Sequence, residues 1–266
     1  MANSAALRAL VTGATGGIGR ATCFALNDAA RAQGLKLAIA VSASKPGPAL
    51  DALVEELNEA GARATGLTAN LADAAACEQL AAQSIATCGG LDVLVSNAGV
   101  MRSAPLAQLA LEDWELVFDV DVRATWLLAR AAHEALAASS GCIVAVGSVS
   151  ALFPFPGLGG YSPAKAALLM LCRQLAQEWA ADGIRVNTVS PGLVRTPLSE
   201  PIYRDEDILR ARMDAVPLGR IGTPEDVARA IVYLAGPDAA YATGIDLRVD
   251  GGLADSVLAT VPGKPR

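Results

Sequence analysis

A tyrosine and a lysine four residues apart carry the strongest chemical signal in this sequence. Tyr161 and Lys165 bound the run Tyr-Ser-Pro-Ala-Lys, and Ser148 lies thirteen residues before the tyrosine. On a helix, residues at this spacing lie on one face. An ammonium group beside a phenol stabilises the anionic form of the phenol and so lowers its pKa, which produces a proton donor and acceptor for use near neutral pH.

A glycine-rich segment near the start of the chain predicts a dinucleotide site. Residues 12–19 read Thr-Gly-Ala-Thr-Gly-Gly-Ile-Gly after an apolar run. Gly13, Gly17 and Gly19 let the backbone turn tightly and approach a pyrophosphate, and the helix that follows supplies free N–H groups at its start. Gly16 leaves two spacings open, TGxxxGxG and TGxxGxxG. Together with the tyrosine and lysine, the turn indicates hydride transfer to a carbonyl or from an alcohol.

Composition narrows the class of protein further. The chain has 266 residues, of which 53% are hydrophobic, enough for one large α/β domain over residues 1–266. A net charge of -6 and a pI near 4.9 argue against nucleic acid as the main partner. No apolar run is long enough to span a membrane, no signal peptide is visible, and the five cysteines are scattered without a CxxC. We therefore expect a cytoplasmic protein with reduced thiols, no membrane partner and no metal.

Short apolar runs alternate with longer stretches rich in Ala and Leu. The predicted strands cover 7–12, 36–42, 63–68, 91–96, 142–147, 184–190 and 245–249, and the predicted helices cover 17–33, 48–60, 73–88, 106–138, 161–181 and 224–235. Several strands are apolar throughout, as expected where helices cover both faces of a sheet. The pattern predicts a Rossmann-like, doubly wound α/β fold with a parallel sheet of about seven strands. The irregular stretch 191–222 follows a strand, which favours an active-site lid over a plain surface excursion.

The end of the second predicted strand bears on the choice of cofactor. An acidic residue there accepts from the ribose 2′-hydroxyl of NAD, whereas a basic residue favours the 2′-phosphate of NADP. The sequence has Ser44 and Lys45 at this point and no acid before Asp51. We therefore expect NADP(H). NAD(H) stays open, because Lys45 is alternatively a solvated loop charge.

These features and four further motifs resemble those of the short-chain dehydrogenase/reductase family over nearly the whole chain. The further motifs are Asn97-Ala98-Gly99, Arg185-Val-Asn187, Pro191-Gly192 with Thr196, and Val249-Asp-Gly-Gly252. The length and the last motif resemble the compact branch of the family. Within that branch, the sequence is most similar in character to 3-oxoacyl-carrier-protein reductases and related secondary-alcohol dehydrogenases.

The resemblance implies a role for each motif. Tyr161 is then the general acid in reduction and the base in oxidation, Lys165 assists it and binds the nicotinamide ribose, and Ser148 binds the substrate oxygen. Besides the tyrosine and lysine, the implied cofactor contacts are Gly13, Thr15, Gly17, Ile18, Gly19, Ser44, Lys45, Asn70, Leu71, Asn97, Ala98, Gly99, Pro191, Gly192, Val194 and Thr196.

One position departs from the family pattern in a way that bears on catalysis. The resemblance implies an asparagine in the long helix after the fourth strand, where it supports a water that connects to the lysine, and this chain has Asp121 there. An ionised Asp121 would offset part of the charge of Lys165 and make the phenol harder to ionise. Alternatively, it accepts the same water hydrogen bond and leaves the relay intact. We expect retained activity with an altered pH profile, and expect Asp121→Asn to move the pH–rate curve of oxidation to lower pH.

The connection before the tyrosine is unusually apolar. Residues 151–158 read Ala-Leu-Phe-Pro-Phe-Pro-Gly-Leu. We predict that Phe153, Phe155 and Leu193 contribute, with Ser148, to the site of a hydrophobic ketone or secondary alcohol, with helix or interface packing as the alternative. The resemblance further implies a homotetramer or homodimer. Two other functions stay open: an NAD-linked alcohol dehydrogenase and a non-catalytic NADP(H)-binding protein.

Overall fold

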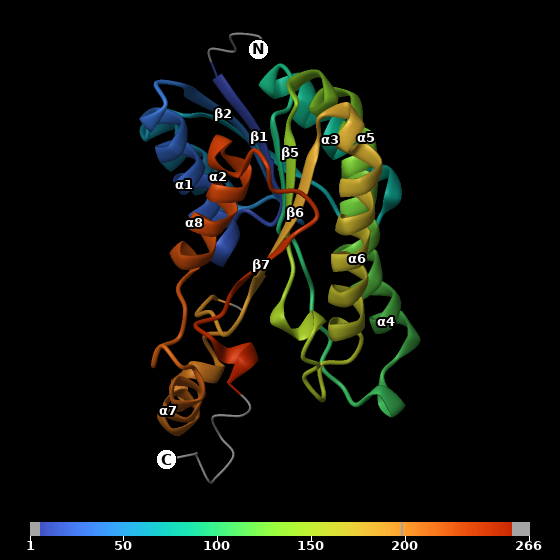
Figure 1. The fold of residues 1–266 in the computed structure, drawn as a ribbon, viewed down its shortest axis with the longest axis vertical. Coiled ribbons are helices and arrows are strands. Elements are labelled where there is room, and N and C mark those ends of the chain that lie inside the picture. Colours follow the sequence, from blue (N-terminus) through green and yellow to red (C-terminus); the bar gives the residue numbers. More distant parts are fainter. Residues whose placement is uncertain (1–5, 198, 257–266) are drawn as a thin grey trace.

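The computed structural model describes residues 6–197 and 199–256. Within them, seven strands form one parallel sheet in the order β3-β2-β1-β4-β5-β6-β7 (Figure 1). The order runs outward in both directions from β1 and β4, so the predicted Rossmann-like, doubly wound sheet is confirmed. The strands are β1 (Ala6–Val11), β2 (Lys36–Ala43), β3 (Arg63–Thr68), β4 (Val93–Ser96), β5 (Cys142–Val146), β6 (Arg185–Pro191) and β7 (Asp246–Val249).

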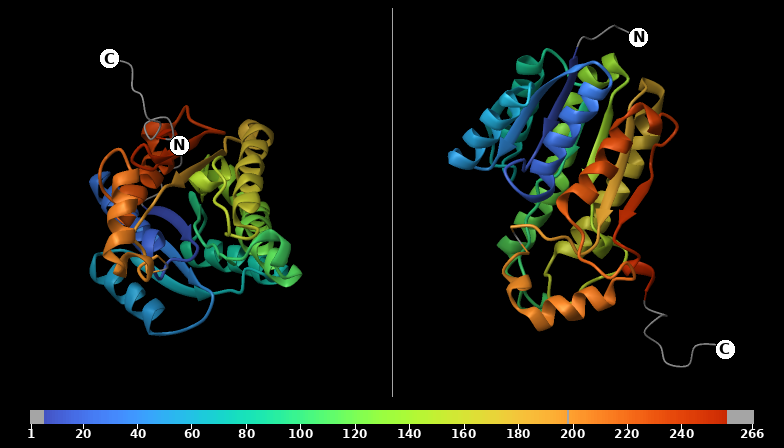
Figure 2. Two further views of the ribbon diagram at one scale, coloured as in Figure 1. Left: turned by 90° about the horizontal axis from the view of Figure 1, so that it is seen from below. Right: turned by 90° about the vertical axis from the view of Figure 1, so that its left-hand side faces the viewer.

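Helices cover both faces of the sheet, as Figures 1 and 2 show. One face carries α1 (Gly17–Ala32), α2 (Pro48–Glu59) and α8 (Pro224–Ala235). The other face carries α3 (Ala74–Cys88), α5 (Ala124–Ser139) and α6 (Tyr161–Trp179). Two further helices, α4 (Leu111–Phe118) and α7 (Glu206–Ala215), lie beyond the carboxyl ends of the strands.

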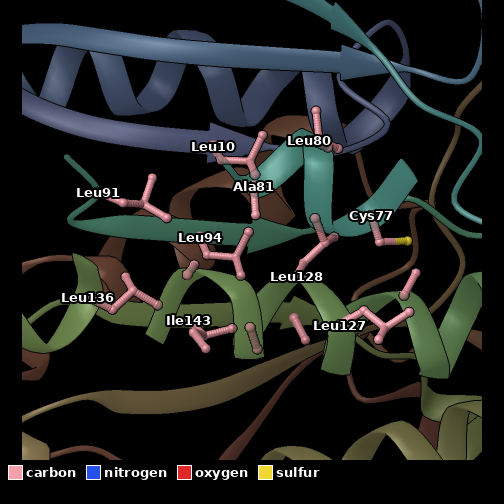
Figure 3. Close-up of a cluster of buried hydrophobic side chains, with 14 of the residues drawn as sticks. Leu10, Cys77, Leu80, Ala81, Leu91, Leu94, Leu127, Leu128, Leu136 and Ile143 are labelled. Atoms are coloured by element: carbon pink, nitrogen blue, oxygen red, sulfur yellow. The ribbon is translucent and has the colours of Figure 1, made fainter. Parts of the chain in front are cut away.

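Side chains of the central strands alternate between two apolar cores. Leu94 and Ile143 point into the core on the side of α3, α5 and α6, where Leu128 also lies (Figure 3). Their neighbours Val95 and Val144 point into the core under α1 and α8. This alternation is the period of two expected for strands that are buried on both faces. Each fully buried side chain of this size contributes about 1.5–3 kcal/mol, and together they fix the strand ends that carry the polar residues.

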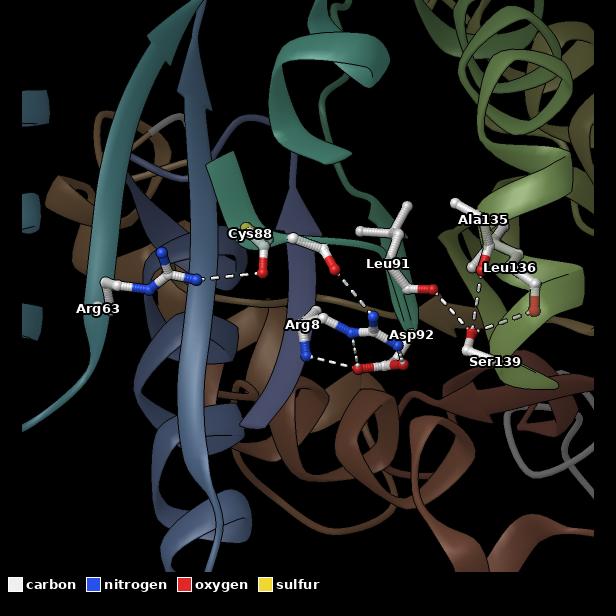
Figure 4. Close-up of polar contacts among 9 residues, drawn as sticks. Arg8, Arg63, Cys88, Leu91, Asp92, Ala135, Leu136 and Ser139 are labelled. Carbon is white, nitrogen blue, oxygen red and sulfur yellow. Dashed lines mark hydrogen bonds and ion pairs between the residues drawn. The ribbon is translucent and has the colours of Figure 1, made fainter. Parts of the chain in front are cut away.

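A polar cluster secures the amino end of β1 and β4. The Arg8 guanidinium binds Asp92 through two N–H donors, its backbone N–H donates to Asp92 Oδ2 at 2.7 Å, and its Nη1 donates to Gly89 O at 3.0 Å (Figure 4). Nearby, Ser139 Oγ donates to Leu91 O at 2.7 Å. These groups lie at the edge of the sheet where the strands begin. They help to hold β1 and β4 in register there, and the edge where the strands end stays free for chemistry.

The single helix expected over 106–138 is divided. A 3₁₀ turn covers Leu106–Gln108, α4 begins only at Leu111, and a π-helical turn, Asp119–Arg123, joins α4 to α5. The hydrophobic pattern did not show the π turn, because a single π turn inserts only one residue into an otherwise continuous helix. π turns are rare and often occur at functional sites.

The irregular stretch 191–222 leaves the sheet after β6 and returns to its starting point. The Arg195 N–H donates to Gly222 O and the Gly222 N–H donates to Leu193 O, both at 2.9 Å, so the two ends are joined. Between them stand the 3₁₀ turn Ile202–Arg204 and α7, which buries none of its side chains. Position 198 lies outside the described residues. The role of this stretch as a lid stays a prediction.

All five cysteines are buried free thiols. Burial raises the pKa of Cys77 and Cys142 to about 11 and that of Cys172 to about 12. Such thiols remain protonated at neutral pH and pack as small apolar side chains. In the ranges that the structure describes, no helix has the length and apolar character needed to cross a membrane.

Candidate active site

Ser148, Tyr161 and Lys165 converge on one cavity of about 390 Å³ at the carboxyl edge of the sheet. Ser148 follows β5, and its Oγ accepts a hydrogen bond from the Ser150 N–H at 3.1 Å. Tyr161 is the first residue of α6, and Lys165 lies one turn further on the same face. Pro163 does not break this helix, because N–H groups of a first turn have no intrahelical partner.

Lys165 is held in place by protein groups on two sides. Its side chain is almost fully buried, and Nζ donates to Val146 O at 3.0 Å. The same Nζ lies 3.1 Å from Asp121 Oδ2 and 5.5 Å from the centre of the Tyr161 ring. Burial is the largest single influence on this ammonium and lowers its pKa. The charge of Asp121, its contact with Nζ and the nearby Tyr161 and Cys172 together outweigh burial, so the pKa of Lys165 is raised above its ordinary value.

Asp121 is a direct partner of Lys165. The π-helical turn points its side chain inward, where it is 1% exposed. Its Oδ1 accepts from the Val100 N–H at 2.8 Å, so one carboxylate joins the loop after β4 to the lysine of α6. Asp121 has two candidate roles: offsetting part of the Lys165 charge, and accepting the hydrogen bond of a relay water. The direct contact with Nζ supports the first. The water relay stays a hypothesis.

The glycine turn is built on the TGxxxGxG spacing. Gly13 and Gly17 have positive φ angles of 61° and 50° and line the cavity. A Cβ on Gly19 would lie 2.3 Å from Gly13 O and 2.6 Å from Asn97 Nδ2, so this position has room only for glycine. Gly16 is extended, and its nearest neighbour would be 3.8 Å from a Cβ. Packing therefore does not require glycine at position 16. This resolves the choice between the two spacings in favour of TGxxxGxG.

Substitution of these glycines tests the turn. Gly19→Ala is expected to lower cofactor affinity at least about tenfold, because the methyl group must displace Gly13 O and the Asn97 amide. The matched change Gly16→Ala has open space and a permitted φ, so affinity should stay within about twofold. Fluorescence titration of nicotinamide binding measures both. Equal losses in the two variants would contradict the assignment.

Asn97 supports the turn from behind. Its Nδ2 donates to Thr12 O at 2.9 Å and to Gly13 O at 3.0 Å. Thr12 in turn accepts the N–H groups of Asn97 and Ala98 on its Oγ1, each at 3.0 Å. These bonds join the ends of β1 and β4 at the point where the strand order reverses, which is where open parallel sheets bind ligands.

A second cavity of about 400 Å³ continues from the turn along the ends of β2 and β3. Its lining includes the predicted cofactor residues Gly13, Thr15, Ser44, Asn70, Leu71, Asn97, Ala98 and Gly99. No acidic residue is among its lining groups in the described part of the chain. Arg102 is the one charged residue in its described lining. Lys45 is exposed and does not line the cavity.

The residues predicted to contact the nicotinamide and the substrate divide between two cavities. Ile18, Pro191, Gly192, Val194 and Thr196 line the cavity that holds Tyr161. Leu193 instead lines a separate cavity of about 230 Å³ with Leu218 and Val227. Val194 lines both cavities, so the two cavities meet along this segment.

The predicted apolar wall lies outside these cavities. Phe153 and Phe155 are 43% and 56% exposed and line neither the catalytic nor the adjoining cavity. Met101 and Val100 supply apolar surface beside Tyr161 instead. A contact of Phe153, Phe155 or Leu193 with substrate stays a prediction. Across the described ranges, no three His, Cys, Asp or Glu side chains gather where they could hold a metal ion.

Comparison with known proteins agrees with this geometry. Residues 13–254 match the family model described as enoyl-(acyl carrier protein) reductase. A 3-oxoacyl-[acyl-carrier-protein] reductase from Synechocystis sp. is 38% identical over 247 residues, which cover 92% of this chain and 96% of that protein. The structure of a putative short-chain alcohol dehydrogenase from Sinorhizobium meliloti matches with a TM-score of 0.86 at 32% identity and covers 96% of this chain and 97% of that chain.

A second solved structure was determined with its cofactor. A putative 2-deoxy-d-gluconate 3-dehydrogenase from Agrobacterium tumefaciens, with bound NADP, has a TM-score of 0.82 at 31% identity and covers 95% of this chain and 99% of that chain. The family match covers the glycine turn from Gly13 onward, Ser148 after β5, and Tyr161 and Lys165 on α6. The chain therefore belongs to the short-chain dehydrogenase/reductase family and is an oxidoreductase of alcohol and carbonyl groups.

Proposed function

We propose that the chain reduces the carbonyl group of an apolar substrate with NADPH, or oxidises the matching secondary alcohol, with Tyr161 as the general acid and base. The observation that carries this proposal is the shared cavity of Ser148, Tyr161 and Lys165, next to the glycine turn. The nearest rival is an NAD-linked alcohol dehydrogenase that uses the same three residues.

The residues around the two cavities fit a dinucleotide. Gly13, Gly17 and the start of α1 leave the backbone N–H groups open to a pyrophosphate. Asn70 and Leu71 would border the adenine, and Ser44 the ribose 2′ position. Because that cavity has no carboxylate in its described lining, it supports a 2′-phosphate better than a 2′-hydroxyl. The relative from Agrobacterium tumefaciens was solved with NADP, which agrees with this choice.

The protein's own groups handle the proton. When bound, the nicotinamide dinucleotide supplies the hydride in reduction and takes it up in oxidation. Ser148 Oγ already accepts a hydrogen bond from Ser150 N, so its O–H is available to donate to a substrate oxygen. As that oxygen gains negative charge, the Tyr161 hydroxyl donates its proton to it, and the Lys165 ammonium stabilises the phenolate that remains. In oxidation the same proton returns from the alcohol to the phenolate.

A panel of carbonyl substrates tests the activity. We expect clear turnover of hydrophobic ketones and 3-oxoacyl thioesters and weak turnover of sugar acids. Turnover is measured from the decrease in the absorbance of the reduced nicotinamide. The Synechocystis relative is named for an acyl-carrier-protein substrate, and the Agrobacterium relative for a gluconate. Clear preference for the sugar acids would contradict the apolar assignment but leave the acid–base chemistry intact.

Cofactor choice is tested at Ser44. NADPH is expected to bind at least about tenfold more tightly than NADH, since a hydrogen bond to a charged group is worth about 1.5–3 kcal/mol. Ser44→Asp supplies an acceptor for the 2′-hydroxyl and repels the phosphate, so it should reverse the preference. Fluorescence titration with each cofactor gives both affinities. Tighter NADH binding by the unaltered chain would refute the NADP assignment.

Self-association is a further part of the proposal. Trp126 of α5 and Met170 of α6 are 40% and 59% exposed on neighbouring helices. Large apolar side chains on such faces favour an interface. Together with the family resemblance, they support a homodimer or homotetramer.

A further inference from the structure

The carboxylate beside the catalytic lysine is the feature of this molecule that the proposed mechanism leaves unused. Asp121 is 1% exposed, and its Oδ2 has no hydrogen-bond donor in good geometry among the described residues. The Lys165 ammonium at 3.1 Å is therefore what compensates the charge on this oxygen. The other oxygen, Oδ1, accepts from the Val100 N–H at 2.8 Å.

The position suits a carboxylate better than an amide. Oδ1 accepts from the Val100 N–H, and Oδ2 lies beside the positively charged Lys165 ammonium. An amide has one acceptor and one N–H₂ donor, so asparagine would leave a donor facing a donor. The backbone of Gly99 packs against this pair. A Cβ added at Gly99 would lie 3.2 Å from Asp121 Oδ2 and 3.5 Å from Lys165 Nζ.

We propose that Asp121 is a positioning residue that holds Lys165 in place and keeps the catalytic proton on the Tyr161/Lys165 pair to higher pH than a neutral residue would. This inference rests on the proposed acid–base role of Tyr161.

Among the charged groups around Lys165, Asp121 has the largest influence. From α6, the ionisable neighbours are Tyr161 and Cys172, and β5 contributes only the Val146 carbonyl. Asp246 of β7 lies behind Cys172, where it accepts hydrogen bonds from Thr188 and Ser190.

The neighbouring charges of the π turn are directed elsewhere. Asp119 and Arg123 pair with each other at 2.6 Å and are partly exposed. Among the described residues, Asp121 is the one carboxylate that forms an ion pair with Lys165.

The direction of the effect follows from electrostatics alone. A negative charge close to two protonated groups raises the pH at which either loses its proton. Burial acts on the Lys165 ammonium in the opposite sense, and Asp121 is the main group that counters it, with smaller contributions from Tyr161 and Cys172. Without the charge of Asp121, the pair gives up its first proton at lower pH, whichever of the two groups releases it.

The test is a spectroscopic pH titration of the free protein. Tyrosinate absorbance is recorded for the unaltered chain, Asp121→Asn and Asp119→Asn, each with and without Tyr161→Phe. The difference within each pair isolates Tyr161 from Tyr203, Tyr233 and Tyr241. We expect this transition to lie at least about one pH unit lower in Asp121→Asn. Asp119→Asn is the matched control from the same turn and should leave the transition unchanged.

Kinetics supply the second measurement. In Asp121→Asn, the alkaline limb of reduction and the acid limb of oxidation should move to lower pH with the spectroscopic transition. If Asp121→Asn does not fold, Asp121→Ser, which is smaller and also neutral, carries the same expectation. Coincident transitions in the neutral variant and the unaltered chain would overturn the inference. Undiminished turnover by Tyr161→Phe would instead refute the proposed function, and the titration would still report on Asp121.

Discussion

Replacement of Tyr161 by phenylalanine is expected to lower kcat by at least about 10²–10⁴-fold, the usual contribution of a positioned general acid. Cofactor affinity should change little, because the ring remains and the glycine turn is untouched. Steady-state kinetics and fluorescence titration measure the two quantities separately. The loss should be the same in both directions of the reaction, since one hydroxyl gives the proton and takes it back.

Tyr233→Phe is the matched control for this experiment. Tyr233 is 47% exposed on α8, and it lines neither cofactor cavity, so turnover should be unaffected. Turnover that survives in Tyr161→Phe would point to a different acid. An unaltered chain that binds NADPH but turns over no carbonyl or alcohol would favour the non-catalytic alternative.

Replacement of Lys165 by methionine is expected to cost about 3–5 kcal/mol in the free energy of unfolding. The change removes the ammonium that compensates Asp121 and leaves an unpaired charge in a buried site. The cost should shrink at acid pH, because a protonated carboxyl carries no charge to bury. Chemical denaturation at several pH values measures this dependence.

A second substitution separates the charge from the packing. Lys165→Met combined with Asp121→Asn removes both charges and should recover most of the lost stability. A double variant no more stable than Lys165→Met alone would show that the loss came from packing. In the unaltered chain, the pKa of Lys165 is raised above its ordinary 10.5. On the alkaline side, the stabilisation by this ion pair is thus fully present up to pH 10.5 and is lost as the pH rises through the folded-state value of Lys165.

Tyr161→Phe and Lys165→Met test different parts of the same site. The first removes the proton and keeps the electrostatics of the site. The second removes the compensating charge, so it affects folding as well as chemistry. The ion pair with Asp121 also explains why a lysine can be retained at 4% exposure, where an unpaired ammonium would lose its charge.

The sequence determined the parallel, doubly wound sheet and the convergence of the motifs. The apolar runs of β4 and β5 and the helices between strands predict a parallel sheet, and the carboxyl ends of parallel strands lie on one edge. Residues 13, 97, 148 and 191 each follow a strand in the sequence, so they meet at that edge without any knowledge of side-chain contacts. The Tyr161 and Lys165 spacing adds a helix face directed to the same place.

The tertiary structure alone decided which way individual side chains point and what they touch. Periodicity reports burial and not hydrogen-bond span, so it did not reveal the π turn that directs Asp121 toward Lys165. The exposure of Phe153 depends on how the 151–158 connection folds back, and composition does not specify this. The necessity of glycine at position 19 comes from Gly13 O and the Asn97 amide, two groups distant in sequence that meet only when β1 and β4 are paired. Contacts between segments far apart in the chain depend on the geometry of the whole sheet, so they cannot be predicted from a local pattern of residues.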